Sequence, residues 1–386
     1  MRKIAVGQAG GPTAVINASL VGLLDGLYET NTVYAVMNGY QGLVEDDMEP
    51  LEEHSLEWVQ QHKLVPGACL GSGRYPFTNE RMQQAVEQLK RRGIDTLVFI
   101  GGNGTMAALQ RLSVLAEEMH YKLQVIGIPK TVDNDLSCTD HAPGFASAAR
   151  YVAMTARDIS KDLEAMRNFE QVRIIETMGR NAGWLALSSG YLKTCDCDGP
   201  HHIYVPERPL AASQFLSDVQ SSVQAFGMAT IVVSEGFTFE GTAQVEREVV
   251  QGRPVLGGIA AQMEAIVREQ LGLTVRSENM GMHQRSAMYA VSEQDLHEAY
   301  EVGAKAAEYV TSGLSNRMVS IQRRDTIEYN YDLVPVPLED VMREGERLLP
   351  DIFIEDPARY YTWLQPIVGE PVPAYPAMRR RSVRSS

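Results

Sequence analysis

The sequence lacks the features that would place the protein in a membrane or make it a disulfide-stabilised secreted domain. No apolar run approaches the roughly 20 residues that cross a bilayer. Four cysteines in 386 residues do not make a disulfide framework. The N-terminal segment carries two basic residues but becomes glycine-rich and polar at once, unlike a secretory signal peptide. We therefore expect a cytoplasmic protein without a membrane partner.

Positive charge is also in short supply. The chain has 35 Lys and Arg against 49 Asp and Glu, so its formal net charge is −14. Nucleic acids and anionic membranes would repel such a chain, and we expect neither as a partner. An anionic substrate would need cations gathered at one place. The hydrophobic share of 44% is that of a globular protein, and the length suits two domains or one large one.

Two common nucleotide-binding motifs are missing as well. The sequence has no Gly-x-x-x-x-Gly-Lys-Ser/Thr, and no Gly-x-Gly-x-x-Gly follows its first expected strand. Both motifs use glycines to bring backbone N–H groups close to phosphates. Their absence argues against a P-loop NTPase and against a dinucleotide-binding dehydrogenase.

What the chain does contain is an alternation of short β-rich runs and longer amphipathic stretches. We expect strands at residues 3–6, 96–100, 125–128, 173–177 and 230–234. Helices are expected up to about residue 24 and over 211–225, 258–271 and 295–312. This alternation is typical of parallel βαβ units, so the predicted class is α/β, with mainly parallel sheets covered by helices.

Glycines and polar residues gather where these strands end, which is where α/β sheets bind ligands. Gly10 and Gly11 follow the first strand, and residues 101–105 (Gly-Gly-Asn-Gly-Thr) follow another; both precede helices whose N-termini can accept an anion. Residues 130–135 combine a lysine with Asp133 and Asp135. One carboxylate could deprotonate a hydroxyl while its neighbour helps to hold Mg²⁺.

Four arginines stand in glycine-rich or strand-end contexts instead of on charged helix faces. They are Arg74, Arg180, Arg276 and Arg285. In a chain of charge −14 their coincidence favours a phosphorylated substrate, because a guanidinium can bind a phosphate through two hydrogen bonds.

The cysteines and histidines carry weaker signals. Cys195 and Cys197 precede His201 and His202, but the Cys-x-Cys spacing is unusual for zinc, and adjacent histidines on a strand point to opposite faces. We favour the absence of a metal there. No partner marks Cys69 or Cys138 as a nucleophile, and we expect His141 and His283 to be hydrogen-bonding residues and not catalysts.

Taken together, the motifs resemble the phosphofructokinase family, and most of all its branch in which some members use ATP and others pyrophosphate. The matching segments follow one another in family order: 7–17, 39–43, 70–76, 101–106, 129–135, 139–147, 176–184, 234–237 and 276–287. NAD and lipid kinases share a similar glycine-rich turn but lack the Thr-x-Asp-Asn-Asp, Met-Gly-Arg and Gln-Arg segments.

The resemblance implies two Rossmann-like lobes. It assigns residues 1–140 to a lobe that binds the phosphoryl donor, with part of 255–320 packing back on it. Residues 141–330 would bind the sugar phosphate, and residues 331–386 would form an extension. We expect the basic end of that extension, residues 379–384, to be solvated. Family members form dimers or tetramers, so a homo-oligomer is expected, in which Arg276 acts across an interface.

The resemblance also implies roles for individual residues. Asp133 corresponds to the base that takes the proton of the sugar 1-hydroxyl, Thr131 to a contact of the transferring phosphoryl group, and Asp135 to a carboxylate near Mg²⁺. Positions that hold the sugar phosphate are Thr131, Asp133, Met178, Gly179, Arg180, Glu235, Arg276, Met282 and Arg285. Positions of the donor site are Gly11, Arg74, Tyr75, Gly102, Asn103, Gly104 and Thr105.

Two positions depart from the family pattern. Asn103 stands where many members have a Mg²⁺-binding aspartate, so it can offer a carbonyl oxygen but no charge. Gly104 is typical of ATP-dependent members, which leave room for the α-phosphate there, whereas Lys130 is typical of pyrophosphate-dependent members. Because Lys130 neutralises either donor, we favour ATP.

The expected activity is therefore that of an ATP-dependent 6-phosphofructokinase of glycolysis, which makes fructose 1,6-bisphosphate from fructose 6-phosphate. Alternatives are the pyrophosphate-dependent enzyme, a relative acting on another acceptor such as sedoheptulose 7-phosphate, and a non-catalytic sugar-phosphate sensor. Retention of Asp133 argues against the sensor, because binding alone needs no base.

Overall fold

The chain forms two compact units in the computed structural model, which describes residues 2–250 and 253–376. Of the described residues, the first unit comprises 2–148, 285–347 and 365–369, and the second comprises 149–250, 253–284, 348–364 and 370–376. We expected boundaries near 140 and 330, with part of 255–320 packing back on the first lobe. The segment that belongs with the N-terminal part of the chain is residues 285–347. The basic end at 379–384 lies outside the described residues.

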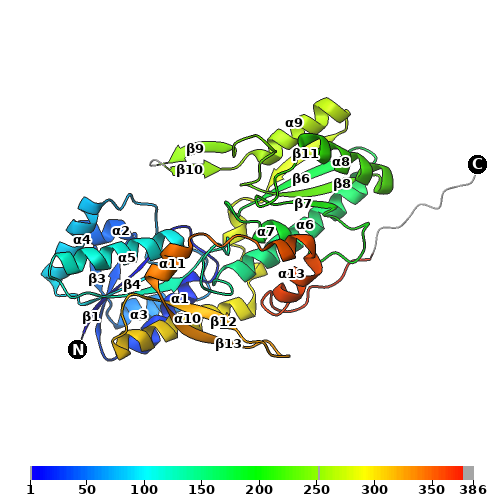
Figure 1. The fold of residues 1–386 in the computed structure, drawn as a ribbon. Coiled ribbons are helices and arrows are strands. Elements are labelled where there is room, and N and C mark those ends of the chain that lie inside the picture. The colour runs from blue at the N-terminus through cyan, green and yellow to red at the C-terminus, as the bar shows by residue number, and fades with distance from the viewer. Residues whose placement is uncertain (1, 251–252, 377–386) are drawn as a thin grey trace, which may run out of the picture. The chain divides into compact units, whose positions relative to one another are not determined.

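The first unit is built on a mostly parallel sheet (Figure 1). Its strands are β1 (Lys3–Gln8), β2 (Thr32–Val36), β3 (Met48–Pro50), β4 (Thr96–Gly101), β5 (Gln124–Pro129), β12 (Arg317–Arg323) and β13 (Tyr331–Pro337). They lie in the order β13-β12-β5-β4-β1-β2-β3, and the two outermost pairs are antiparallel. The β4 strand is buried along its whole length, as expected for a strand covered on both faces.

Helices cover both faces of this sheet. They are α1 (Ile16–Leu27), α2 (Tyr40–Glu45), α3 (Glu53–Gln61), α4 (Asn79–Arg92), α5 (Asn103–Glu118), α10 (Glu293–Ser312) and α11 (Leu338–Glu344). Alternate residues of the strands face opposite cores: Ile4 and Val6 pack with α1 and α10, whereas Ala5 packs with α4 and α5. This packing on both faces holds the strands in place. Because β1, β4 and β5 are parallel, the loops that follow them lie at the same edge of the sheet, at the carboxyl ends of the strands.

The second unit has its own parallel sheet, ordered β11-β6-β8-β7. Its strands are β6 (Val172–Thr177), β7 (His202–Tyr204), β8 (Ala229–Ser234) and β11 (Val275–Asn279), and a separate hairpin pairs β9 (Glu246–Val250) with β10 (Arg253–Leu256). Its helices include α7 (Trp184–Ser188), α8 (Ala212–Phe226), α9 (Ile259–Leu271), α12 (Asp351–Glu355) and α13 (Pro357–Leu364). Helix α6 (Phe145–Met166) begins in the first unit and continues into the second.

The predicted α/β class is confirmed, and the expected strands and helices all occur within a few residues of the expected bounds. The C-terminal residues differ from the expected single extension. β13 and α11 belong to the first unit, whereas α12 and α13 belong to the second, where Tyr360 packs beside Trp184. In the described residues, none of the helices combines the length and apolarity needed to cross a membrane.

A disulfide joins Cys195 to Cys197 in the second unit, a pairing that the sequence analysis did not predict. Cys69 and Cys138 are free thiols. Burial raises the pKa of the Cys69 thiol to about 12, so this thiol is protonated at neutral pH and is a poor nucleophile.

Candidate functional site

The loop after β1 is the first component of the site in the first unit. Gly10 has φ +77°, a left-handed conformation that glycine adopts without strain. Its N–H donates to the Gly73 carbonyl oxygen at 3.2 Å, and the Ser72 hydroxyl donates to the Gly10 carbonyl oxygen at 2.6 Å. These bonds join the loop after β1 to the segment that carries Arg74.

Two cations lie against this loop. The Lys130 ammonium donates to the Gly11 carbonyl oxygen at 2.6 Å. A Cβ placed on Gly11 would come within 2.6 Å of Nη1 of Arg285, so no larger residue fits there while the guanidinium keeps its position. The absence of a side chain at Gly11 therefore lets positive charge approach the backbone closely.

The charges around Lys130 change its acidity. Burial lowers the pKa of Lys130 to about 8; Asp133 and Asp135 oppose this effect, and the cations Arg285 and Arg74 add to it. The pKa of Arg285 is likewise lowered, first by burial and then by Arg74, against the opposing charge of Asp133. Such a cluster of mutually repelling, desolvated cations is stabilised when a polyanion binds, as expected at a functional site.

The loop after β5 supplies the carboxylates. The Thr131 hydroxyl donates to Oδ1 of Asp135 at 3.2 Å and accepts the backbone N–H of Asp133 at 3.1 Å. Asn134, between the two aspartates, has φ +53° and is fully buried. A non-glycine residue in this region is uncommon, although asparagine tolerates it best. The loop therefore has one defined shape, which sets the separation of its two carboxylates.

The N-terminus of α5 completes this group. Gly102 precedes the helix, and the first turn of a 16-residue helix presents backbone N–H groups that favour a bound anion. The Asn103 side-chain N–H donates to the Asp135 carbonyl oxygen at 2.8 Å, which ties the helix to the loop after β5. A Cβ at Gly104 would meet no atom within 4 Å, so there is open space beside this turn.

The donor set of these residues suits a polyphosphate with Mg²⁺. Carboxylate and amide oxygens are the ligands that Mg²⁺ prefers, and Asp135 and Asn103 offer one of each kind within a hydrogen-bonded pair of segments. Lys130, Arg285 and the α5 N-terminus offer positive charge for phosphate oxygens. The first unit can therefore hold a phosphoryl donor beside a carboxylate, Asp133, that is able to accept a proton.

The loop after β6 is the main feature of the site in the second unit. Gly179 and Arg180 both have positive φ, at +144° and +52°. The Arg180 backbone N–H donates to Oε1 of Glu235 at 3.1 Å, and the Met178 N–H donates to Oε1 of Gln284 at 2.9 Å. Burial raises the pKa of Glu235. The strained backbone at Arg180 is thus held by side chains from the residue that follows β8 and from the 3₁₀ turn at Gly281–Arg285.

The remaining predicted residues are more exposed. Arg276 lies on β11 with 60% of its side chain exposed, and its Nε is 3.1 Å from a carboxylate oxygen of the buried Glu170. Met282 is 59% exposed. Tyr75 packs under the Arg81 guanidinium, 4.4 Å from the ring centroid. Glu170 therefore holds the Arg276 guanidinium in place at a position open to solvent.

The structure brings some of the predicted residues together and places others elsewhere. Of those in the first unit, the group around the loops after β1, β4 and β5 contains Gly11, Arg74, Gly102, Asn103, Gly104, Thr105, Lys130, Thr131, Asp133, Asp135 and Arg285. Arg285, which the resemblance assigned to the sugar phosphate, lies beside the loop after β1. In the second unit Met178, Gly179, Arg180 and Glu235 form one group.

Two further residues support these loops, and sequence reasoning missed one of them, Glu176. Glu176, at the end of β6, accepts the backbone N–H groups of Gly258 and Ala260 and so caps α9. His141 lies fully buried between two carboxylates. A carboxylate at the end of a buried strand was a usable signal for Glu176. The expected hydrogen-bonding role of His141 is confirmed, but its partner Glu298, 157 residues away, could not be identified from the sequence.

The two α/β units and their polar loops at strand ends are those of an α/β phosphotransferase whose first unit can hold a phosphorylated donor. The particular family follows from comparison with known proteins. The phosphofructokinase family model matches residues 3–310, and the chain belongs to this family.

Three similar proteins have names that indicate different substrates. The chain is 49% identical to a sulfofructose kinase of Alkalicoccus urumqiensis, over 96% of both chains. It is 35% identical to a pyrophosphate–fructose 6-phosphate 1-phosphotransferase of Rhodospirillum rubrum, over 96% of this chain and 95% of the other. The crystal structure of a pyrophosphate-dependent phosphofructokinase from Marinobacter aquaeolei superposes with a TM-score of 0.85 at 29% identity, covering 98% and 95%.

Membership of the family and the fold are thus confirmed, as is phosphoryl transfer to a sugar phosphate as the activity of the family. The names of the relatives differ in donor and acceptor. The expectation of ATP and fructose 6-phosphate is therefore one of several pairings within this family.

Proposed function

We propose that the protein transfers a phosphoryl group from ATP to a primary hydroxyl of sulfofructose, the fructose derivative that carries a sulfonate. The observation that carries this acceptor is the 49% identity, over 96% of both chains, to a protein named sulfofructose kinase. A sulfonate and a phosphate monoester are both tetrahedral anions, so arginines can bind either. Fructose 6-phosphate, our expectation from the sequence, is the second acceptor.

Gly104 supports ATP as the donor. The open space at this position leaves room beside the α5 N-terminus for a group beyond the two terminal phosphates. Pyrophosphate is the second donor, because Lys130 is typical of enzymes that use it and a pyrophosphate-dependent relative is 35% identical.

In the proposed reaction the residues of the first unit act mainly by position and charge. Lys130, Arg74 and Arg285 neutralise the donor phosphates, and the α5 N-terminus adds its backbone N–H groups. Asp133 accepts the proton of the attacking hydroxyl. Asp135 and Asn103 would hold Mg²⁺, which supplies charge neutralisation to the phosphates when bound. In the second unit we assign Arg180, Glu235, Arg276 and Met282 to the acceptor.

The test is a matrix of two donors and two acceptors on the purified protein with Mg²⁺. ATP and pyrophosphate are each combined with sulfofructose and with fructose 6-phosphate. The product, phosphorylated sulfofructose or fructose 1,6-bisphosphate, is quantified by mass spectrometry. The proposal expects the highest kcat/KM for ATP with sulfofructose. A higher value for fructose 6-phosphate overturns the acceptor, and a higher value for pyrophosphate overturns the donor. Turnover with none of the four pairs would favour the non-catalytic sensor.

We further propose a homodimer or homotetramer in which Arg276 serves a neighbouring subunit. Light scattering after size-exclusion chromatography gives the mass. Mixing Asp133→Asn with Arg276→Ala protein then tests the sharing, because hybrids with one intact site would regain activity that neither parent has.

A further inference from the structure

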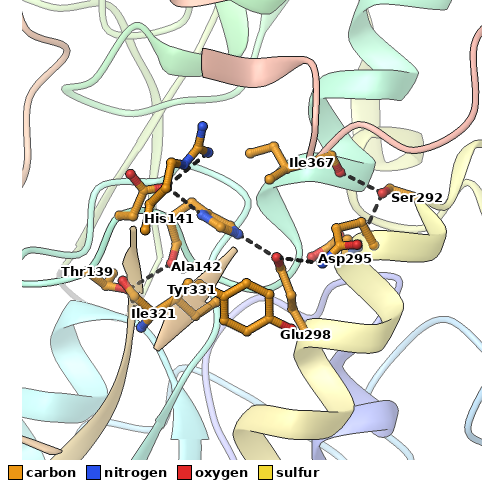
Figure 2. A network of polar contacts seen from close by, with 12 residues as sticks. Thr139, His141, Ala142, Ser292, Asp295, Glu298, Ile321, Tyr331 and Ile367 are labelled. Atoms are coloured by element: carbon orange, nitrogen blue, oxygen red, sulfur yellow. Dashed lines mark hydrogen bonds and ion pairs between the residues drawn. The ribbon is translucent and has the colours of Figure 1, made fainter. Parts of the chain in front are cut away.

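A buried charged cluster lies next to the loop after β5 in the first unit. His141 has no exposed side-chain area; its Nδ1 is 2.8 Å from Oδ2 of Asp140 and its Nε2 is 2.6 Å from Oε2 of Glu298 on α10. Figure 2 shows the imidazole directed at Glu298, with Asp295 and Ser292 further along the same helical segment. Because both ring nitrogens meet carboxylate oxygens, both carry protons and the ring is a cation.

Other charged groups also face this cluster. Nη2 of Arg323 on β12 is 3.1 Å from the same carboxylate of Asp140, and the Arg347 guanidinium donates to the Asp140 carbonyl oxygen. Glu298 also accepts hydrogen bonds from the Tyr329 hydroxyl and from Gln294. Burial disfavours the imidazolium, but the charge of Glu298 and the bonds to Asp140 and Glu298 together raise the pKa of His141 to about 9. The cation therefore persists at neutral pH.

The segment that carries His141 is bonded directly to the loop of Thr131 and Asp133. The Ala142 N–H donates to the side-chain oxygen of Asn134 at 3.2 Å, and the Thr131 N–H donates to the Pro143 carbonyl oxygen at 3.3 Å. A backbone bridge also pairs Thr131 with Gly144. A shift of residues 141–144 would thus move the residues on either side of Asp133.

The same segment is anchored a second time on α10. The Gly144 N–H donates to Oδ1 of Asp295 at 2.8 Å, and the Ser147 N–H donates to its Oδ2 at 3.0 Å. Asp295 lies one helical turn before Glu298, so the first turns of α10 hold the segment at two points. The loop needs such support, because Asn134 and Cys138 both have positive φ, and strained backbone persists only where its surroundings fix it.

We infer that His141 is a positioning residue for phosphoryl transfer: clamped between Asp140 and Glu298, it holds residues 141–144 and through them the orientation of Asp133. This inference rests on the proposed role of Asp133. We assign His141 no contact with the donor or with the acceptor. Its loss should therefore reduce kcat while leaving both KM values nearly unchanged, because a displacement of about 1 Å at reacting groups costs on the order of 10²-fold in rate.

The test compares His141→Phe, which removes the cation between the two carboxylates and leaves Arg323 beside Asp140, with His141→Gln and Glu298→Gln, which keep hydrogen-bonding groups. The control is His201→Gln in the second unit, where another largely buried histidine accepts the Thr230 N–H at 2.9 Å. Each variant is first shown to be folded by circular dichroism and by a melting point above the assay temperature. We expect kcat to fall about 10²-fold in His141→Phe, less in the two glutamine variants, and by less than threefold in the control.

A kcat within threefold of the wild type in folded His141→Phe protein would overturn the inference, as would a loss confined to KM. Hydrogen exchange provides a readout that does not need turnover. The Thr131, Ala142 and Gly144 amides should exchange at least tenfold faster in His141→Gln, with no change in the second unit. If the wild type were inactive with all four substrate pairs, the proposed function would fail, and unchanged exchange at these amides would separately overturn the positioning role.

Discussion

Lys130 allows a quantitative prediction of how much a buried charge at the proposed donor site lowers the free energy of unfolding. Its side chain is 4% exposed, and burial lowers its pKa from 10.5 to about 8 despite the attraction of Asp133 and Asp135. Between pH 8 and 10.5 the unfolded chain binds more protons than the folded one, so stability rises with pH over this range. The charged lysine therefore costs about 3 kcal/mol at pH 7 and about 1 kcal/mol at pH 9.5.

Replacing the charge should make the protein more stable and less active. Lys130→Met removes the cost of about 3 kcal/mol at pH 7 but also a hydrogen bond to Gly11 worth about 1 kcal/mol. We expect a net gain of about 2 kcal/mol at pH 7 that nearly vanishes at pH 9.5. Urea unfolding followed by pulse-labelling mass spectrometry resolves the first unit from the second. A variant that is less stable than the wild type at pH 7, or a difference that does not change with pH, would refute the reasoning.

The same titration should appear in the kinetics of the wild-type enzyme. The neutral amine binds phosphate oxygens less well, so kcat/KM for the donor should fall as the pH rises through about 8. Lys130→Arg keeps its charge throughout this range and should lose this limb of the profile. A wild-type profile that is flat between pH 7 and 9.5 would mean that donor binding does not use the charge of Lys130.

Three further predictions concern single sites. Asp133→Asn should lower kcat by about 10³-fold, within the range for a general base, while calorimetry shows acceptor binding within threefold of the wild type; retained turnover would mean that another group is the base. Gly104→Asp should fold, because open space and the α5 N-terminus accommodate a carboxylate. It should lose more ATP-dependent activity than Gly104→Asn does, and the pyrophosphate-dependent activity of both variants is measured for comparison. Thiol titration of the unfolded, unreduced protein should find two thiols, because Cys195 and Cys197 are joined; four would contradict the disulfide.

The sequence was informative where a local pattern determines the structure. The continuous apolar run at 96–100 and the glycines after it predicted β4 and the start of α5 correctly, because a buried parallel strand and a turn that approaches its ligand impose residue types on adjacent positions. The aspartates after β5 likewise lie in a loop at the end of a strand, as expected, while their catalytic and metal-binding roles stay predictions. The position of such loops can be predicted from one sequence.

Contacts between distant parts of the chain could not be predicted in this way. His141 pairs with Glu298, and Arg285 reaches the loop of Gly11, across separations that leave no periodic trace. The return of residues 285–347 to the N-terminal unit also has no local signal; only the family resemblance indicated that part of 255–320 packs back. The structure adds the exact segment, in which β12 joins the sheet beside β5.

Asn103 illustrates why a departure from a family pattern need not mean a lost function. An aspartate at this position could offer Mg²⁺ a charged ligand but could not donate a hydrogen bond. The Asn103 amide donates to the Asp135 carbonyl oxygen at 2.8 Å and so holds the first turn of α5 against the loop that carries both aspartates. Its side-chain oxygen remains chemically able to bind a cation. Asn103 thus exchanges one negative charge for a bond between the two segments to which we assign the donor phosphates and the base. In a group where Lys130 is already desolvated, a smaller negative charge near the donor phosphates also reduces their repulsion. An asparagine at position 103 is therefore compatible with phosphoryl transfer in which position and cationic charge contribute most of the catalysis.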